Sequence, residues 1–298
     1  MILYWLFRFS SFVGRRIPPS TSYKLASLIA DLVYLVWREK RLITIQNMTH
    51  VVGANGGPKE AERLARQSLR NYGKYLVDFI RIPGLKKEAI EGDVKFSGWE
   101  HIDASLQHGK GLICVGLHLG NWDMGAAHVA LRNYPVNVIV ETFKYPRLNE
   151  LVQGTRSVLG LRIIPMEQAA RGILRVLRQN EMLALLVDRP AADDGVPVQF
   201  FGSLASVPAG AAMLSLRTGA HIVPACTVRQ ADNTYLAFVE KHIEYQPVGD
   251  LNRDIQALTQ KIMDAMESLI RRYPEQWYMF RPMWGGAFPA GSVGSKVA

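Results

Sequence analysis

The sequence predicts an α/β fold, in which helices flank a central, mostly parallel or mixed sheet behind a basic, helical N-terminal segment. From about residue 95 onward, short apolar runs rich in β-branched residues alternate with amphipathic runs at helical spacing. Strands that alternate with helices imply a largely parallel or mixed sheet covered on both faces. Before residue 90 this alternation is absent, and apolar residues recur at helical spacing.

The chain is long enough for one large domain. It has 298 residues, of which 48% are hydrophobic and 20% charged, as expected for a globular protein with a sizeable core. We expect one integrated domain with three parts. A helical membrane-associating segment covers residues 1–90, an α/β domain residues 91–285, and a flexible tail residues 286–298.

The excess of basic over acidic residues lies entirely in the N-terminal part. Residues 1–87 hold 15 Lys and Arg against 5 Asp and Glu, a net charge of +10, whereas the rest holds 20 against 21. Basic charge beside exposed apolar surface favours anionic lipid headgroups. No recognised nucleic-acid-binding motif accompanies the charge, so we predict an anionic membrane surface and no nucleic acid as partner.

Two apolar stretches open the chain. "MILYWLFRFSSFVGRRIPP" (1–19) has its arginines after the apolar part and lacks the cleavage site of a signal peptide. "YKLASLIADLVYLVW" (23–37) contains Asp31 and is shorter than the roughly 20 residues of a clean membrane span. We expect interfacial helices at the cytoplasmic face of the plasma membrane, with a tilted N-terminal span as the alternative.

The α/β part is expected to contain the following elements in order. Strands are predicted at 111–117, 136–141, 162–166, 182–188, 198–202, 221–230 and 234–246, and helices at 121–133, 146–160, 168–180, 208–219 and 251–273.

The strand "GLICVGL" continues into "HLGNWD", which places His118 at a strand end and Asp123 at the start of the next helix. In such sheets, sites form at the carboxyl ends of strands. Gly120 allows a tight turn that folds Asp123 back onto the imidazole, giving a general base and its orienting carboxylate. No serine or cysteine lies in the motif, so the base would act on a substrate hydroxyl. The alternative is that both residues only cap their elements.

"HLGNWD" resembles the His-four-residues-acid motif of glycerolipid and lipid A acyltransferases. The fuller resemblance is to the family of late lipid A acyltransferases and phosphatidylinositol mannoside acyltransferases. It rests on "TRSVLGLRIIP" (155–165), "DRPAADDGVPVQFFGSLASVPAGAAMLSLRTGAHIVPA" (188–225) and "EQWYMFRPMW" (275–284). The resemblance covers nearly the whole chain, including the basic helical N-terminal part, and the last block looks closer to the mannoside branch.

The resemblance implies a membrane-associated O-acyltransferase. A fatty acyl group would move from a thioester carrier, acyl-CoA or acyl carrier protein, to a hydroxyl of a phosphatidylinositol-mannoside-like or lipid-A-like glycolipid. By resemblance, His118 and Asp123 carry the catalytic roles, and Arg156, Asp188 and Arg189 are substrate-site residues. Asp188 also ends a predicted strand, and its competing role is to cap a helix.

Further expectations concern the rest of the site. Phe200 and Phe201 either line an apolar groove for the acyl chain or pack in the core. Backbone N–H groups near Gly120 are candidates to stabilise the tetrahedral oxyanion. Neither a metal nor a cofactor is needed, and no Cys or His spacing indicates zinc. A thioester hydrolase and a catalytically silent membrane-binding relative remain the alternative functions.

Overall fold

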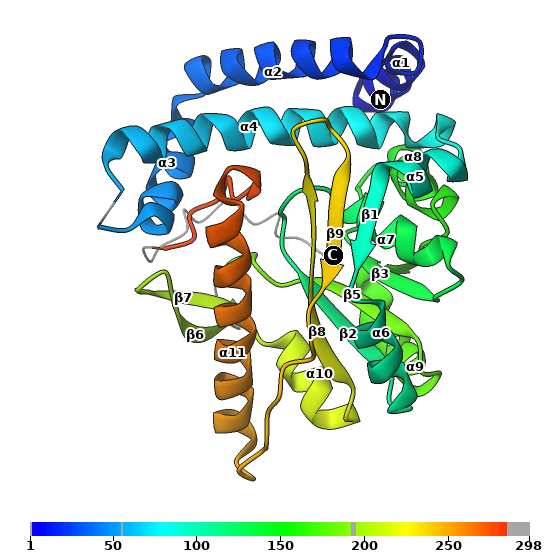
Figure 1. The fold of residues 1–298 in the computed structure, drawn as a ribbon, viewed down its shortest axis with the longest axis vertical. Coiled ribbons are helices and arrows are strands. Elements are labelled where there is room, and N and C mark those ends of the chain that lie inside the picture. The colour runs from blue at the N-terminus through cyan, green and yellow to red at the C-terminus, as the bar shows by residue number, and fades with distance from the viewer. Residues whose placement is uncertain (1, 55, 192–194, 285–298) are drawn as a thin grey trace.

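The computed structural model describes residues 2–54, 56–191 and 195–284, and its centre is a seven-stranded sheet with the order β1-β9-β8-β2-β5-β3-β4 (Figure 1). All neighbouring strands are parallel except β8 and β9, which are antiparallel. The predicted mixed sheet is therefore confirmed. The strands are β1 (Val94–Ser97), β2 (Leu112–Gly116), β3 (Val136–Val140), β4 (Arg162–Pro165), β5 (Met182–Leu186), β8 (His221–Arg229) and β9 (Tyr235–Val239).

Helices cover both faces of the sheet. Because side chains alternate along a strand, Leu112 and Ile113 of β2 belong to two different core clusters. The Ile113 cluster contains α9 (Ala169–Arg178), α10 (Gly210–Thr218) and α11 (Leu251–Arg272). The Leu112 cluster contains α6 (Trp99–Gln107), α7 (Trp122–Leu131) and α8 (Pro146–Val158). Short elements are α5 (Lys87–Asp93) and the 3₁₀ turns at 82–84, 166–168 and 274–276.

The N-terminal segment is helical, as predicted. It forms α1 (Ile2–Gly14), α2 (Pro19–Val36), α3 (Arg38–Val52) and α4 (Pro58–Arg81), and α4 crosses one end of the sheet with α2 on its outer side (Figure 1). A Cβ on Gly73 of α4 would lie only 3.1 Å from the Ala26 carbonyl of α2, so the two helices cross closely. Met48 and Leu64 share the core cluster of Ile113.

Two element predictions differ from the structure. The expected strand 234–246 ends at Val239, and the following segment stays beside β8 only through hydrogen bonds from Glu240 N to Pro224 O and from Ile243 N to Ile222 O. The "VQFFG" strand is half of a separate antiparallel hairpin, β6 (Gly195–Phe200) and β7 (Ser203–Pro208). The predicted tail 286–298 lies outside the described residues.

Candidate active site

The candidate site lies at the carboxyl edge of β2 and β5, which are parallel neighbours. Their register pairs Gly116 with Leu186. His118 and Asp188 each follow two residues later, so the register brings them to the same edge. The two side chains meet there, with His118 Nδ1 2.7 Å from Asp188 Oδ1.

Asp188 is fully buried and accepts three hydrogen bonds. Besides the imidazole, its Oδ2 accepts from the backbone N of His118 at 3.0 Å and from Trp277 Nε1 at 2.9 Å. Burial by itself raises the pKa of Asp188, but the facing imidazole and these donors outweigh burial and hold the pKa below its ordinary value. Asp188 is therefore a buried carboxylate that stays ionised.

This pairing fixes the tautomer of His118. An ionised carboxylate only accepts hydrogen bonds, so Nδ1 carries the proton and Nε2 keeps its lone pair. No hydrogen bond to Nε2 is formed by the residues that the structure describes, and the side chain is 18% exposed. The edge of the Trp122 ring lies against the imidazole, with centroids 5.3 Å apart. Nε2 is thus an oriented base with access from outside.

The expectation that Asp123 orients His118 was wrong. Asp123 Oδ2 accepts from the Tyr75 hydroxyl at 2.8 Å, and Oδ1 accepts from Arg156 Nε at 2.9 Å. The physical reason is that Asp123 lies in the first turn of α7 and meets α4 and α8, while Asp188 already occupies Nδ1 of His118. Asp123 is 2% exposed, so the guanidinium of Arg156 balances a buried charge.

The turn between β2 and α7 is tightly bonded. Gly120 has a positive φ of 66°, and a Cβ there would overlap the Thr227 carbonyl. The backbone N–H groups of Gly120 and Asn121 already donate to Gln276 O at 2.9 Å and Thr227 O at 2.8 Å. The expectation that N–H groups near Gly120 stabilise an oxyanion therefore fails, because these donors are occupied.

The other predicted site residues are spread over the edge of the site and the core. Arg189 pairs with Glu141 at the surface. Phe200 is fully buried and Phe201 is 7% exposed, and both pack against Trp277. The two phenylalanines therefore lie behind Trp277, the tryptophan that donates to Asp188. They pack in the core, which is the second of the two roles expected from the sequence. A contact with the acyl chain stays a prediction.

Tyr75 and Trp277 are site residues that the sequence analysis did not assign. Trp277 lies within the block 275–284 that carries the resemblance, which was the available signal. Tyr75 had no signal beyond its place in the predicted helical segment 1–90. The pairing of His118 with Asp188 had a signal: His118 directly follows the predicted strand 111–117, and Asp188 ends the predicted strand 182–188.

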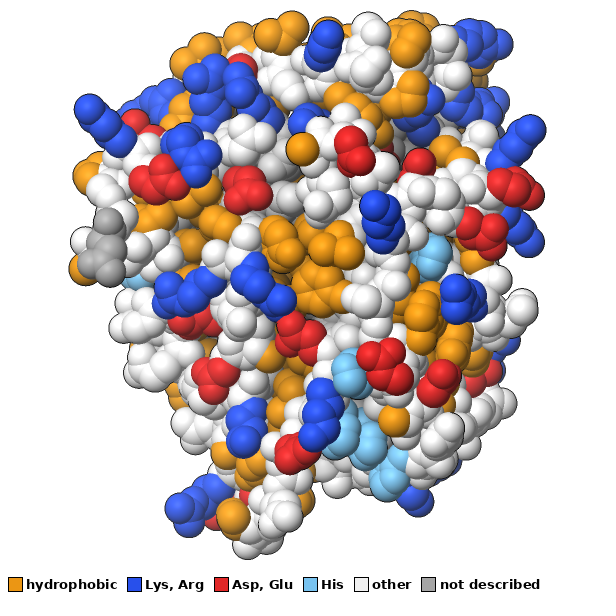
Figure 2. Space-filling view, in the orientation of Figure 1, with side chains coloured by type: hydrophobic (Ala, Val, Ile, Leu, Met, Phe, Trp, Pro, Cys, Tyr) orange, Lys and Arg blue, Asp and Glu red, His pale blue; other side chains and the backbone are white. Residues whose placement is uncertain are grey.

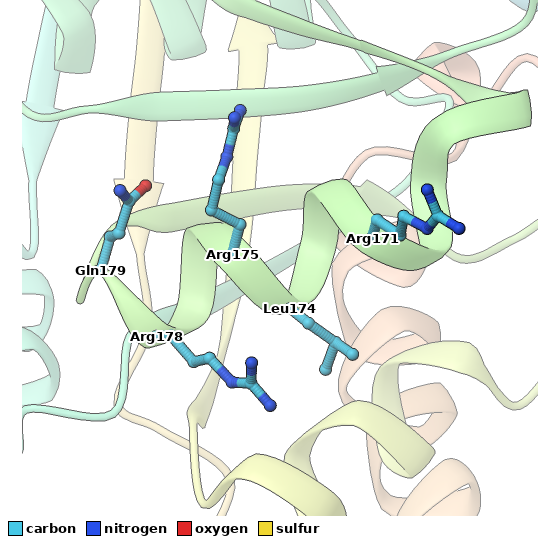
Figure 3. A pocket seen from close by; sticks show the side chains of 5 residues that line it. All are labelled: Arg171, Leu174, Arg175, Arg178 and Gln179. Carbon is cyan, nitrogen blue, oxygen red and sulfur yellow. The ribbon is translucent and has the colours of Figure 1, made fainter.

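A surface cavity of about 320 Å³ lies elsewhere, along the outer side of α9 (Figure 3). Arg171, Arg175 and Arg178 fan out from the helix around Leu174. No residue of the His118 site lines this cavity, and we assign it no part in the chemistry.

A buried aspartate that orients a partly exposed histidine, at the carboxyl edge of a mixed α/β sheet, defines a site for general-base chemistry. The family model for bacterial lipid A biosynthesis acyltransferases matches residues 1–285. The chain belongs to this acyltransferase family.

The chain is also similar to curated phosphatidylinositol mannoside acyltransferases. The chain is 26% identical over 288 residues to a phosphatidylinositol mannoside acyltransferase of Mycolicibacterium smegmatis, covering 87% of this chain and 93% of that protein. It is 30% identical over 250 residues to phosphatidylinositol mannoside acyltransferases of two Mycobacterium tuberculosis strains, covering 80% of this chain and 75% of each relative. Among solved structures, PlsC, the 1-acyl-sn-glycerophosphate acyltransferase of Thermotoga maritima, matches with a TM-score of 0.34 and 13% identity over 83% of this chain and 94% of that one.

Proposed function

We propose that this protein is a membrane-associated O-acyltransferase that moves a fatty acyl group from a thioester carrier to a hydroxyl of a membrane glycolipid. The observation that carries the proposal is the free Nε2 of His118, oriented by the buried Asp188. Family membership supports the reaction class, and the names of the curated relatives support a phosphatidylinositol-mannoside-like acceptor.

The geometry supports a direct transfer. Nε2 of His118 takes the proton of the acceptor hydroxyl, whose oxygen attacks the thioester carbonyl. The negative charge of Asp188 stabilises the imidazolium that forms. When the tetrahedral intermediate collapses, the new C–O ester bond remains, the C–S bond breaks, and the imidazolium returns its proton to the leaving thiolate. The step balances with no metal, cofactor or protein nucleophile.

The oxyanion needs a donor other than Gly120. The first N–H groups of a helix have no intrahelical acceptor and lie at its positive end. At α7, Asn121 caps the N–H of Met124 at 3.2 Å, which leaves the N–H groups of Trp122 and Asp123 next to the histidine turn. We assign the oxyanion to these two groups.

Asp123 has a different role from Asp188 in this proposal. It holds the Arg156 guanidinium and the Tyr75 hydroxyl beside the turn. Arg156 is 19% exposed and offers a planar fork that suits a phosphate of the acceptor or donor. Arg189, at the same edge of the sheet, is the second candidate for contact with an anionic group.

The N-terminal helices provide the protein surface that contacts the membrane in this proposal. Large apolar side chains of α1 and α2 are exposed, and Lys and Arg lie among them along the top of Figure 2. On α2 the exposed apolar side chains recur on one face of the helix: Leu25, Leu28, Ile29, Leu32, Leu35 and Val36. Across the described parts of the chain, no helix is both long and apolar enough to cross a bilayer. We propose that α1 and α2 lie on the anionic cytoplasmic face of the plasma membrane.

The test is acyl transfer by the purified full chain. Acyl-CoA and acyl carrier protein are offered separately with phosphatidylinositol mannosides or lipid A precursors, and mass spectrometry identifies the acylated product. His118→Ala should lower the rate by about 10²–10⁴-fold with its fold intact. His101→Ala, which changes a partly exposed histidine of α6, is the matched control.

Three outcomes would overturn the proposal. Thioester hydrolysis that exceeds transfer with every acceptor would indicate a hydrolase that uses the same base on water. Full transfer by His118→Ala would remove the mechanism, and absence of turnover in the wild-type chain would favour a silent membrane-binding relative.

A further inference from the structure

A buried polar cluster lies behind the histidine turn, outside the His118–Asp188 pair. Its centre is the carboxylate of Asp78 on α4, which is 7% exposed. Four side chains from four other places in the fold donate to this carboxylate. We call the group the Asp78 cluster: Asp78 on α4, Tyr23 on α2, Asn121 at the start of α7, Arg229 at the end of β8 and Tyr235 at the start of β9.

Both oxygens of the carboxylate accept hydrogen bonds. Oδ1 accepts from the Tyr23 hydroxyl at 2.6 Å, and Oδ2 accepts from Asn121 Nδ2 at 3.1 Å, from Arg229 Nη2 and from the Tyr235 hydroxyl. Burial and the charge of Asp78 raise the pKa of Tyr23 to about 12, so this hydroxyl stays a donor. The Arg229 guanidinium balances the charge, because a buried carboxylate without a partner would be costly.

Asn121 connects this cluster to the histidine turn. Its Nδ2 donates both to Asp78 and to the Tyr235 hydroxyl, each at 3.1 Å. Its Oδ1 caps α7, and its backbone N is bonded to Thr227 O at 2.8 Å. Asn121 lies three residues after His118 and directly before Trp122, whose ring lies against the imidazole.

A second connection runs through Gln276. Its side chain bonds the backbone N and O of Arg229, at 2.8 and 2.9 Å, and its carbonyl accepts from Gly120 N. The turn 118–121 is therefore held from both sides by the elements that carry the Asp78 cluster. None of these contacts involves a group that faces the free Nε2 of His118.

We infer that Asp78 and Asn121 are positioning residues for acyl transfer: their carboxylate–amide bond fixes the turn that carries His118, and Tyr23 ties that turn to the membrane-facing helix α2. The inference rests on the proposed function of the His118 site. Both residues are buried, neither bonds the imidazole of His118, and they act through the turn. Displacement of a catalytic group by about 1 Å can reduce turnover 10²-fold.

Asn121→Ser separates positioning from helix capping. Serine is as good an N-cap as asparagine, so α7 keeps its cap, but its short side chain does not reach Asp78. We expect kcat to fall by about 10–100-fold, with KM values for donor and acceptor changed by less than about threefold and a small change in melting temperature.

The control is Asp254→Asn. Asp254 is buried like Asp78, at 3% exposure, and accepts hydrogen bonds from Tyr245, Val248 N and Gly249 N at the end of α11 that lies away from α4 (Figure 1). This variant should lose stability while keeping kcat. The inference is overturned if Asn121→Ser keeps the wild-type kcat, or if kcat in both variants falls in step with the melting temperature.

Tyr23→Phe tests the link to α2. It removes one hydroxyl and leaves the Asp78–Arg229 pair intact, so the chain should fold. We expect kcat to fall a few-fold even with a detergent-dispersed acceptor. In the double variant with Asn121→Ser, the loss of kcat should be smaller than the product of the two single losses, because both side chains act through the Asp78 carboxylate. A multiplicative double variant, or wild-type kcat in Tyr23→Phe, would overturn this link.

The same rate ratios apply if the wild-type chain hydrolyses the thioester instead of transferring the acyl group. Failure of the proposed reaction would appear in the wild-type product, whereas failure of positioning would appear in the ratio of variant to wild type. The two outcomes are therefore distinguishable.

Discussion

Asp188 and Asp123 are two of the buried aspartates around the histidine turn, and their different partners give them different tasks. Asp188 contacts the imidazole, whereas Asp123 contacts Arg156 and Tyr75. Asp188→Asn should therefore lower kcat by about 10²–10⁴-fold, because the amide permits the wrong tautomer of His118. Asp123→Asn should lower kcat less and weaken binding of anionic substrate parts, measured as a raised KM. Equal losses of kcat in the two variants would contradict this division.

The depressed pKa of Asp188 predicts how stability depends on pH. The folded state favours the ionised form of Asp188. The stability that this carboxylate contributes is therefore present above the unfolded pKa of about 4, and it is lost as the pH falls through the lower pKa of the folded state. The difference in unfolding free energy between the wild-type chain and Asp188→Asn should stay level from pH 7 to about pH 5 and shrink below about pH 4. A decline already between pH 7 and pH 5 would show that burial dominates and raises this pKa.

At the scale of elements, the close packing of α7 against β8 fixes the position of the turn that carries the site. A Cβ on Gly125 of α7 would overlap the Thr227 side chain of β8, whereas Gly154 of α8 faces open space. Gly125→Ala should therefore lower the free energy of unfolding by about 1–3 kcal/mol through overpacking. Gly154→Ala, the control, should raise it by up to about 1 kcal/mol through helix propensity. Denaturant titration measures both.

Thr227→Ala provides the second half of that test. Removing the hydroxyl relieves the overlap, so the double variant with Gly125→Ala should recover part of the lost stability. If Gly125→Ala were as stable as Gly154→Ala, the close packing of α7 on β8 would be wrong.

The elements that the sequence predicted well are those whose signal is local. Buried strands such as β2 and β5 and the amphipathic helices carry their periodicity within one short window. The strand order depends on pairings between distant segments, such as β1 with β9 and β2 with β8, so it had no local signal. For the same reason His118 was identified from its own strand end, while its partner was taken from the adjacent helix rather than the neighbouring strand.

At the scale of the whole molecule, basic side chains and exposed apolar side chains lie together at the end of the fold formed by the N-terminal helices. The α1–α2 layer carries the exposed apolar face and lies on α4, which crosses the end of the sheet (Figure 1). Asp31 of α2 bonds Arg66 and Arg70 of α4, which hold the pKa of Asp31 well below its ordinary range. The layer is thus fixed to the enzyme, and a membrane-bound acceptor would reach His118 from the same side as α4.

This arrangement predicts that one charge on the outer face of α2 weakens membrane binding. Leu32 is 59% exposed on that face, and removing such a side chain from the interface costs about 1.5–3 kcal/mol, so Leu32→Glu should weaken binding to anionic phosphatidylglycerol vesicles by at least about tenfold. Leu204→Glu is the matched control, because Leu204 is 64% exposed but lies on the β6–β7 hairpin. Binding of the wild-type chain should also weaken as salt rises, since lysines and arginines of the N-terminal part supply the attraction. Vesicle co-sedimentation at two salt concentrations measures both effects, and equal binding by the two leucine variants would show that α2 does not face the membrane.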